Sequence, residues 1–186
     1  MKIALYFGSF NPMHVGHLAI CRYLMEHCDI DELRLVVSPT NPLKDESNEK
    51  SAEERLKHVK KVAAGLEKEA LQKGLKCKIC VSSIEFKLPK PLYTIDTLRT
   101  ITAREKGNKF ILIIGADNLA IIEKWNRWKE LLNEFEVWVY PRKGYDIESL
   151  CKKYGVKPLD APMIDISSSE IREAELSGKD MSAYKV

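Results

Sequence analysis

Two histidines, His14 and His17, stand three residues apart in the segment GSFNPMHVGH at residues 8–17. If a helix starts here, both rings lie on one face of its first turn. That turn presents free N–H groups and the positive end of the helix dipole, which attract anions and disfavour cations by ~0.3–1 kcal/mol. A bound polyphosphate removes this conflict, because its charge favours the protonated, donor forms of both imidazoles. The spacing therefore indicates a phosphate site.

The residues alone leave other interpretations of this histidine pair open. Both histidines could be ordinary buried or capping residues at a helix start. A zinc site needs further ligands, and neither a third ligand nor a common zinc spacing occurs nearby, so we predict no metal site. Gly8 lets the chain turn sharply after the apolar run that precedes it, which favours the phosphate interpretation.

A second group of donors lies near the end of the sequence, in the segment ISSSEIR at residues 166–172. Ser167 and Glu170 have the spacing of a capping box, which predicts that a helix begins here. Arg172 then falls in the first turns, where a cation is poorly placed unless an anion is bound, and its guanidinium suits phosphate. The alternative is a well-capped helix with a solvated arginine. Taken together, the two helix N-termini favour a site in which both bind the same triphosphate.

These segments need elements that bring them together, and the chain alternates apolar runs of strand length with amphipathic segments of helix length. We expect strands over residues 3–7, 33–37, 76–86, 110–114, 135–140 and 163–166. We expect helices over residues 15–27, 51–72, 94–104, 118–132 with a break near Trp125, 147–154 and 168–176. This order predicts an α/β fold with a Rossmann-like, doubly wound, mostly parallel sheet and helices on both faces. Ligands of such sheets bind at the carboxyl ends of the strands, where both segments fall.

Composition narrows the classes of function. The 186 residues are 45% hydrophobic and 31% charged, with a formal net charge of only +3, which is typical of an ordinary globular protein. This balance predicts neither a nucleic-acid nor a membrane surface. The five cysteines are an odd number without a disulfide pattern, and the first apolar run is too short for a secretory segment, so we expect a cytoplasmic protein.

The first loop resembles the signature of the HxGH nucleotidylyltransferase superfamily, and residues 166–172 resemble the second signature of that superfamily. The resemblance implies that His14, His17 and Arg172 are catalytic. It also implies an ATP-binding set that comprises Gly8, Ser9, Phe10, His14, His17, Ile166, Ser167, Ser168 and Arg172. In this interpretation the late segment holds the phosphates that leave as pyrophosphate.

Further segments are similar to motifs of nicotinate-mononucleotide adenylyltransferases: residues 92–98, 115–119 and 141–145, with a tryptophan at 125. The resemblance implies that Trp125 stacks on the pyridine ring, while Trp128 is expected in the core. The implied acceptor-binding set comprises Phe7, Lys44, Thr94, Gly115, Asp117, Trp125 and Arg142. Leu43 stands where many members of the family have a histidine, which weakens the assignment of Lys44.

The resemblance implies an enzyme that joins nicotinate mononucleotide to the AMP part of ATP, giving deamido-NAD and pyrophosphate in NAD biosynthesis. Its partners are then ATP, with Mg²⁺ carried by the ATP, and nicotinate mononucleotide; assembly into a homo-oligomer stays open. We expect residues 1–186 to form one nucleotidyltransferase domain that ends in a short helical segment. The alternatives are a sibling adenylyl- or cytidylyltransferase with another acceptor, and a nucleotide sensor without catalysis.

Overall fold

The computed structural model describes residues 1–40 and 51–186, and it centres on a six-stranded sheet in the order β3-β2-β1-β4-β5-β6. Every pairing between these strands is parallel. The strands are β1 (Lys2–Gly8), β2 (Glu32–Val37), β3 (Lys78–Ser82), β4 (Lys109–Gly115), β5 (Glu136–Tyr140) and β6 (Lys157–Pro158). From β1 the chain adds β2 and β3 on one side of the sheet and then β4, β5 and β6 on the other side. A crevice is therefore expected at the carboxyl ends of β1 and β4.

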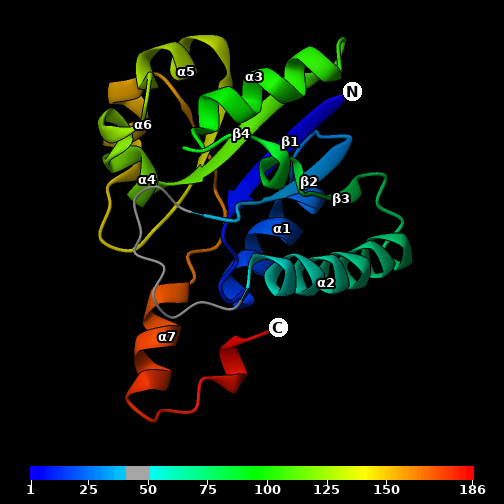
Figure 1. Ribbon diagram of the computed structural model, residues 1–186, viewed down its shortest axis with the longest axis vertical. Coiled ribbons are helices and arrows are strands. Elements are labelled where there is room, and N and C mark those ends of the chain that lie inside the picture. Colours follow the sequence, from blue (N-terminus) through cyan, green and yellow to red (C-terminus); the bar gives the residue numbers. More distant parts are fainter. Residues whose placement is uncertain (41–50) are drawn as a thin grey trace.

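Helices cover both faces of the sheet (Figure 1). One face carries α1 (Val15–His27) and α2 (Ala52–Gln72), and the other carries α3 (Thr94–Arg104), α4 (Ala116–Ala120), α5 (Trp128–Glu134) and α6 (Ile147–Tyr154). The last helix, α7 (Ser168–Leu176), projects beyond the sheet and is followed by the short 3-10 helix η3 (Ser182–Tyr184) (Figure 1). Within the described ranges, no helix is both long and apolar enough to cross a lipid bilayer.

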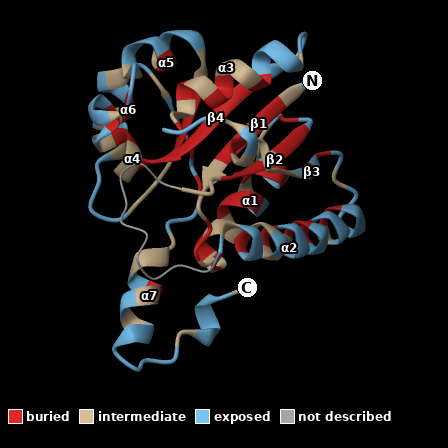
Figure 2. Cartoon of the chain, in the orientation of Figure 1, coloured by how far each residue is buried: buried red, intermediate tan, exposed pale blue. Residues whose placement is uncertain are grey.

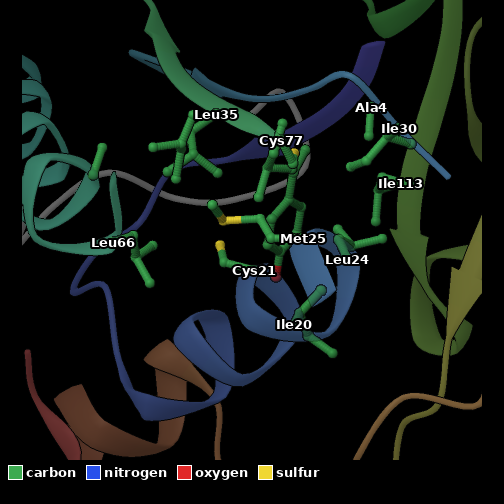
Figure 3. Packing of buried hydrophobic residues seen from close by; sticks show 14 of the residues in the cluster. Ala4, Ile20, Cys21, Leu24, Met25, Ile30, Leu35, Leu66, Cys77 and Ile113 are labelled. Carbon is green, nitrogen blue, oxygen red and sulfur yellow. The ribbon is translucent and has the colours of Figure 1, made fainter. Parts of the chain in front are cut away.

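Alternating side chains of the central strands divide the core into two layers (Figure 2). Ala4 and Tyr6 of β1 face the layer under α1 and α2, whereas Ile3 and Leu5 face the layer under the other helices. In the first layer, Ile20 and Leu24 of α1 pack beneath the sheet (Figure 3). Because both faces are covered, the central strands are apolar throughout, as the sequence indicated.

Most elements match the sequence prediction, and three differ. The strand expected over 76–86 ends at Ser82 and is followed by the 3-10 helix η1 (Ile84–Lys87), because the chain turns to bury Glu85 against Thr97. The strand expected over 163–166 is wrong: the carbonyl of Ile166 accepts from Arg142 instead of from a strand, and the last strand is Lys157–Pro158. The expected helix over 118–132 is divided into α4, the 3-10 helix η2 (Ile122–Lys124) and α5, with the predicted break at Trp125.

Candidate active site

A cavity of about 500 Å³ opens at the carboxyl ends of β1, β4 and β5. Its walls come from both ends of the described chain, since the β1–α1 loop and the start of α7 face the same space. The expected site residues that line it are Phe7, Gly8, Ser9, Phe10, His14, His17, Thr94, Asp117, Trp125, Arg142, Ser167 and Ser168. The volume is in the range of small-molecule sites, so the geometry suits a nucleotide-sized ligand.

The two histidines form a reciprocal cap at the start of α1. His14 is the N-cap, and its Nδ1 accepts a hydrogen bond from the backbone N–H of Gly16 at 3.1 Å. In return, the backbone N–H of His14 donates to Nδ1 of His17 at 3.2 Å, and the two ring centroids are 3.8 Å apart. An Nδ1 that accepts a hydrogen bond carries no proton, so each neutral ring holds its proton on Nε2 and offers it as a donor.

His14 is only 3% exposed, and this burial decides its charge. Burial, assisted by the Arg142 cation, lowers the pKa of His14 from 6.5 to about 4, against an opposing effect of Glu170. The sequence interpretation assigned protonated imidazoles to the site. The structure instead favours a neutral His14 that donates from Nε2, and a bound polyphosphate has to supply the charge that would protonate it.

We expect the buried His14 to make the protein less stable as the pH falls from 6.5 toward 4. In this interval the unfolded chain binds the proton and the folded state does not, so stability is present above the unfolded pKa and is lost on acidification. The contribution is roughly 3–4 kcal/mol, at about 1.4 kcal/mol for each pKa unit. Urea unfolding of the wild type and His14→Asn across this range measures it. Asparagine also caps helices, so its curve should fall less steeply; parallel curves contradict the assignment.

Two glycines make room for the rings of this loop. A Cβ on Gly16 would stand 2.8 Å from Cε1 and 2.9 Å from Nδ1 of His14, closer than side-chain contacts allow. A Cβ on Gly8 would meet the Phe10 ring at 3.0 Å. Phe10 itself is 2% exposed and adopts a left-handed φ of 49°, which places its ring against His17 with centroids 5.1 Å apart. The glycines of the motif are therefore required by neighbouring side chains.

The start of α7 is held against the first loop. Ser167 caps the helix by accepting from the backbone N–H of Glu170, which is one half of the predicted capping box, and Ser168 Oγ donates to the carbonyl of Pro12 at 2.9 Å. The guanidinium of Arg172 donates to the carbonyl of Asn11 and to Ser169 Oγ at 3.3 Å. Arg172 and Ile166 are not among the described residues that line the cavity. In this structure Arg172 instead connects the start of α7 to the β1–α1 loop.

The acceptor side is built at the ends of β4 and β5. A Cβ on Gly115 would lie 2.3 Å from Oδ1 of Asp117 and 3.0 Å from the Tyr140 ring, so this glycine gives Asp117 its place. Arg142 lies with Nε 3.8 Å from Oδ2 of Asp117 and donates to the carbonyl of Ile166 at 3.2 Å. Arg142 thereby ties β5 to the segment before α7. Lys44, the remaining expected residue, lies outside the described residues.

The two tryptophans differ in their surroundings. Trp125 lines the cavity, whereas Trp128 packs edge-to-face on Tyr154 with ring centroids 6.0 Å apart. In the described part of the chain, the buried side-chain polar atoms without a hydrogen-bonding partner are Asn11 Nδ2, Asp117 Oδ1 and Trp125 Nε1. Unpaired buried polar atoms are costly, and all three of these belong to the cavity wall or the first loop. This arrangement is typical of a site that pairs its polar groups with a ligand.

Sequence reasoning missed several residues that shape the cavity. Arg55 is 3% exposed and donates to three backbone carbonyls at the ends of β1 and β2. Glu85 is buried on the wall, and that burial raises the pKa of its carboxyl. Arg55 could have been found, because it stands four residues before Val59 on the apolar stripe of α2, where a cation is out of place. Glu85 gave no comparable signal.

A parallel α/β sheet with two helix starts around one cavity is the arrangement of a nucleotide-binding protein of the Rossmann-like class. The family model described as cytidylyltransferase-like matches residues 5–174. Curated relatives include a probable nicotinate-nucleotide adenylyltransferase of Flavobacterium johnsoniae, 38% identical over 97% of this chain and 90% of the relative. The chain therefore belongs to the nicotinate-nucleotide adenylyltransferase family, within the cytidylyltransferase-like group.

Other proteins of the same description agree. The probable nicotinate-nucleotide adenylyltransferase of Porphyromonas gingivalis is 39% identical over 97% of this chain and 87% of its own. The fold is also that of a Plasmodium falciparum nicotinic acid mononucleotide adenylyltransferase solved with NaAD, with a TM-score of 0.76, 21% identity and coverage of 97% and 87% of the two chains. The structural likeness supports the fold, and the sequence identity supports the family.

Proposed function

We propose that this enzyme transfers the adenylyl group of ATP to nicotinate mononucleotide, giving deamido-NAD and pyrophosphate for NAD biosynthesis. The observation that carries the proposal is the single cavity shared by two helix starts from distant parts of the chain. One helix start presents His14 and His17, and the other presents Ser167 and Ser168. Both ends attract anions, so a triphosphate can lie between them.

In the proposed reaction, an oxygen of the mononucleotide 5′-phosphate attacks the α-phosphorus of ATP in line. A new P–O bond forms, the bond between the α-phosphorus and the bridging oxygen breaks, and pyrophosphate leaves with that electron pair. The attacking phosphate is already anionic, so no protein nucleophile or strong base is required. The protein contributes by positioning and by stabilising charge. The Nε2–H groups of His14 and His17 serve the α/β region, and Ser168 with the nearby Arg172 serves the leaving group.

The acceptor is assigned to the other half of the cavity. Trp125 offers an aromatic face to the pyridine ring, and Asp117 offers an unpaired carboxylate oxygen to ribose hydroxyls. The start of α3 has no side-chain cap, and Thr94 at that start lines the cavity, so the nicotinate carboxylate fits there. We therefore propose a preference for nicotinate over nicotinamide.

Mg²⁺ is expected to arrive with ATP, bound by phosphate oxygens and water. Residues 1–40 and 51–186 contain no group of three or more histidine, cysteine or acidic side chains that could hold a metal ion. The ion would neutralise charge on the phosphates. We also propose that the whole described chain acts as one catalytic unit, because Arg172 and Ser168 fix α7 to the loop of Asn11 and Pro12.

Pyrophosphate release by the purified protein tests the function directly. ATP and CTP are each combined with nicotinate mononucleotide, nicotinamide mononucleotide and phosphopantetheine, with Mg²⁺ present. Rapid release with ATP and nicotinate mononucleotide, together with deamido-NAD as the product, supports the proposal. Turnover with another pair identifies a sibling transferase instead. Tight ATP binding without turnover on any acceptor identifies a sensor.

Trp125→Ala is expected to raise the KM for nicotinate mononucleotide by roughly 2- to 10-fold through lost stacking alone, with the KM for ATP little changed. The matched control is Trp128→Ala, which removes a ring of the same size that packs on Tyr154 away from the cavity. The control should lower the thermal midpoint while its KM values stay near those of the wild type. Equal changes in acceptor KM for both variants would show that Trp125 acts only as core.

A further inference from the structure

Arg55 sits in an unfavourable place for a cation. It is the fourth residue of α2, within the first turns, and it is 3% exposed on the buried stripe that continues through Val59 and Ala63. A positive charge near a helix start is disfavoured, and burial of a guanidinium adds a larger cost unless its donors are satisfied. Its position therefore requires strong acceptors, and these show what the residue does.

The acceptors are backbone carbonyls of two different loops. Nη1 of Arg55 donates to the carbonyls of Ser9 and Ser38, the latter at 2.9 Å, and Nη2 donates to the carbonyl of Pro39 at 2.8 Å. Ser9 follows β1, and Ser38 and Pro39 follow the neighbouring β2. A further bond joins the same loops, from the N–H of Ser38 to the carbonyl of Gly8 at 2.9 Å. One planar guanidinium thus bridges the loops at the carboxyl ends of two central strands.

The bond to Ser9 acts on the most constrained residue of the phosphate loop. The carbonyl of Ser9 belongs to the same peptide plane as the nitrogen of Phe10, and Phe10 holds a φ of 49°. A residue with a side chain costs roughly 1–2 kcal/mol in this left-handed region, so neighbouring groups must impose the conformation. By fixing the plane of that peptide, Arg55 fixes the direction in which the Phe10 side chain leaves the loop.

The Phe10 ring passes this constraint to His17. It is wedged between Gly8, Tyr6 and His17, with centroids 5.8 Å from Tyr6 and 5.1 Å from His17, both edge-on. Side chains packed this closely leave few alternative rotamers, so the orientation of the imidazole depends on the ring behind it. His17 is held on its other side by the backbone N–H of His14.

We infer that Arg55 is a positioning residue for adenylyl transfer: it clamps the β1 and β2 loops, imposes the turn at Phe10 and thereby aims the His17 imidazole. The expected effect on turnover rests on the proposed function, whereas the effect of Arg55 on the orientation of His17 does not. In the contacts above Arg55 donates to backbone carbonyls, and it is not among the described residues that line the cavity. Lysine is not equivalent, because an ammonium lacks the second, rigidly placed nitrogen through which the planar guanidinium also holds the carbonyl of Pro39.

The test compares Arg55→Lys and Arg55→Met with Arg34→Met, a matched control. Arg34 is also a largely buried arginine, with a side chain 13% exposed, but it pairs with Glu32 and Glu105 away from the cavity. We expect kcat to fall about 10-fold in Arg55→Lys and up to about 10²-fold in Arg55→Met, since small misplacements of catalytic groups have effects of this size. The acceptor KM should stay within about 2-fold in Arg55→Lys, and Arg34→Met should keep its kcat.

A double mutant separates positioning from general loss of structure. If Arg55 acts through His17, then Arg55→Lys costs less than about 2-fold in a His17→Ala background, because groups that act as a unit are not additive. The same 10-fold loss in both backgrounds overturns the inference. The side-chain NMR signals of His17 provide a readout that needs no turnover: they should shift in Arg55→Lys and not in Arg34→Met. If the wild type shows no activity with any acceptor, the proposed function fails while this readout still decides the role of Arg55.

Discussion

Replacing His17 by alanine is expected to lower kcat for adenylyl transfer by about 10²–10³-fold, the usual cost of removing one donor aimed at charge that builds in the transition state. The structure gives the donor a defined direction, because Nδ1 of His17 accepts from the backbone N–H of His14 and the proton of the neutral ring therefore lies on Nε2. The variant also loses one half of the reciprocal cap, so a stability loss of roughly 0.5–2 kcal/mol is expected without loss of the fold. Steady-state kinetics and urea unfolding measure the two effects separately.

The control for this variant is His27→Ala, which removes an exposed histidine from the other end of α1. It should leave both kcat and KM near the wild type. Because the expected loss for His17→Ala lies in the transition state, kcat and kcat/KM should fall together. Turnover by His17→Ala within about 5-fold of the wild type would remove His17 from the mechanism and weaken the phosphate assignment of the first loop.

The sequence was most informative where local chemistry decides the structure. α1 and α3 begin and end at the predicted residues, because apolar residues at helical spacing mark the interior of each helix. The β/α alternation predicts a parallel sheet, in which the carboxyl ends of all strands lie at one edge, whereas the reversal of strand order between β1 and β4 is seen only in the structure. The predicted helix starts and the predicted parallel sheet together suffice to place the two phosphate signatures at one edge of the sheet.

The sequence failed where a long-range contact overrides local preference. Residues 163–166 have the apolar character of a strand, yet the carbonyl of Ile166 is taken by Arg142 from the end of β5. Glu85 ends the predicted strand early because its carboxyl is buried against Thr97 from α3. Partners of this kind are set by the tertiary fold, so no window of local sequence contains them. The neutral state of His14 has the same origin, since it depends on burial and on Arg142.

Gly16→Ala is expected to lower kcat by about 10²-fold, although alanine is the better helix former by roughly 0.8–1 kcal/mol. The added methyl group would stand 2.8–2.9 Å from two ring atoms of His14, and Cβ of Ile164 at 3.5 Å limits retreat on another side. The His14 ring must therefore move, and its hydrogen bond from the N–H of Gly16 must lengthen or break. His14 is the more deeply buried ring of the cap, so a shift of the ring also moves its Nε2–H. That donor would then no longer point toward the proposed phosphate position.

Gly65→Ala is the matched control, because Gly65 lies in α2 and a Cβ there meets nothing within 4 Å. That variant should raise the free energy of unfolding by roughly 0.5–1 kcal/mol and leave kcat unchanged. The two substitutions are chemically identical, so a difference between them measures what the His14 ring requires and excludes helix propensity as the cause. Wild-type turnover in Gly16→Ala would mean that the His14 ring tolerates displacement, and His14 could then contribute to the cap alone. If Gly16→Ala loses activity while its free energy of unfolding stays unchanged, the loss comes from the displaced His14 ring and not from unfolding. The methyl group itself favours the helix, as Gly65→Ala should show.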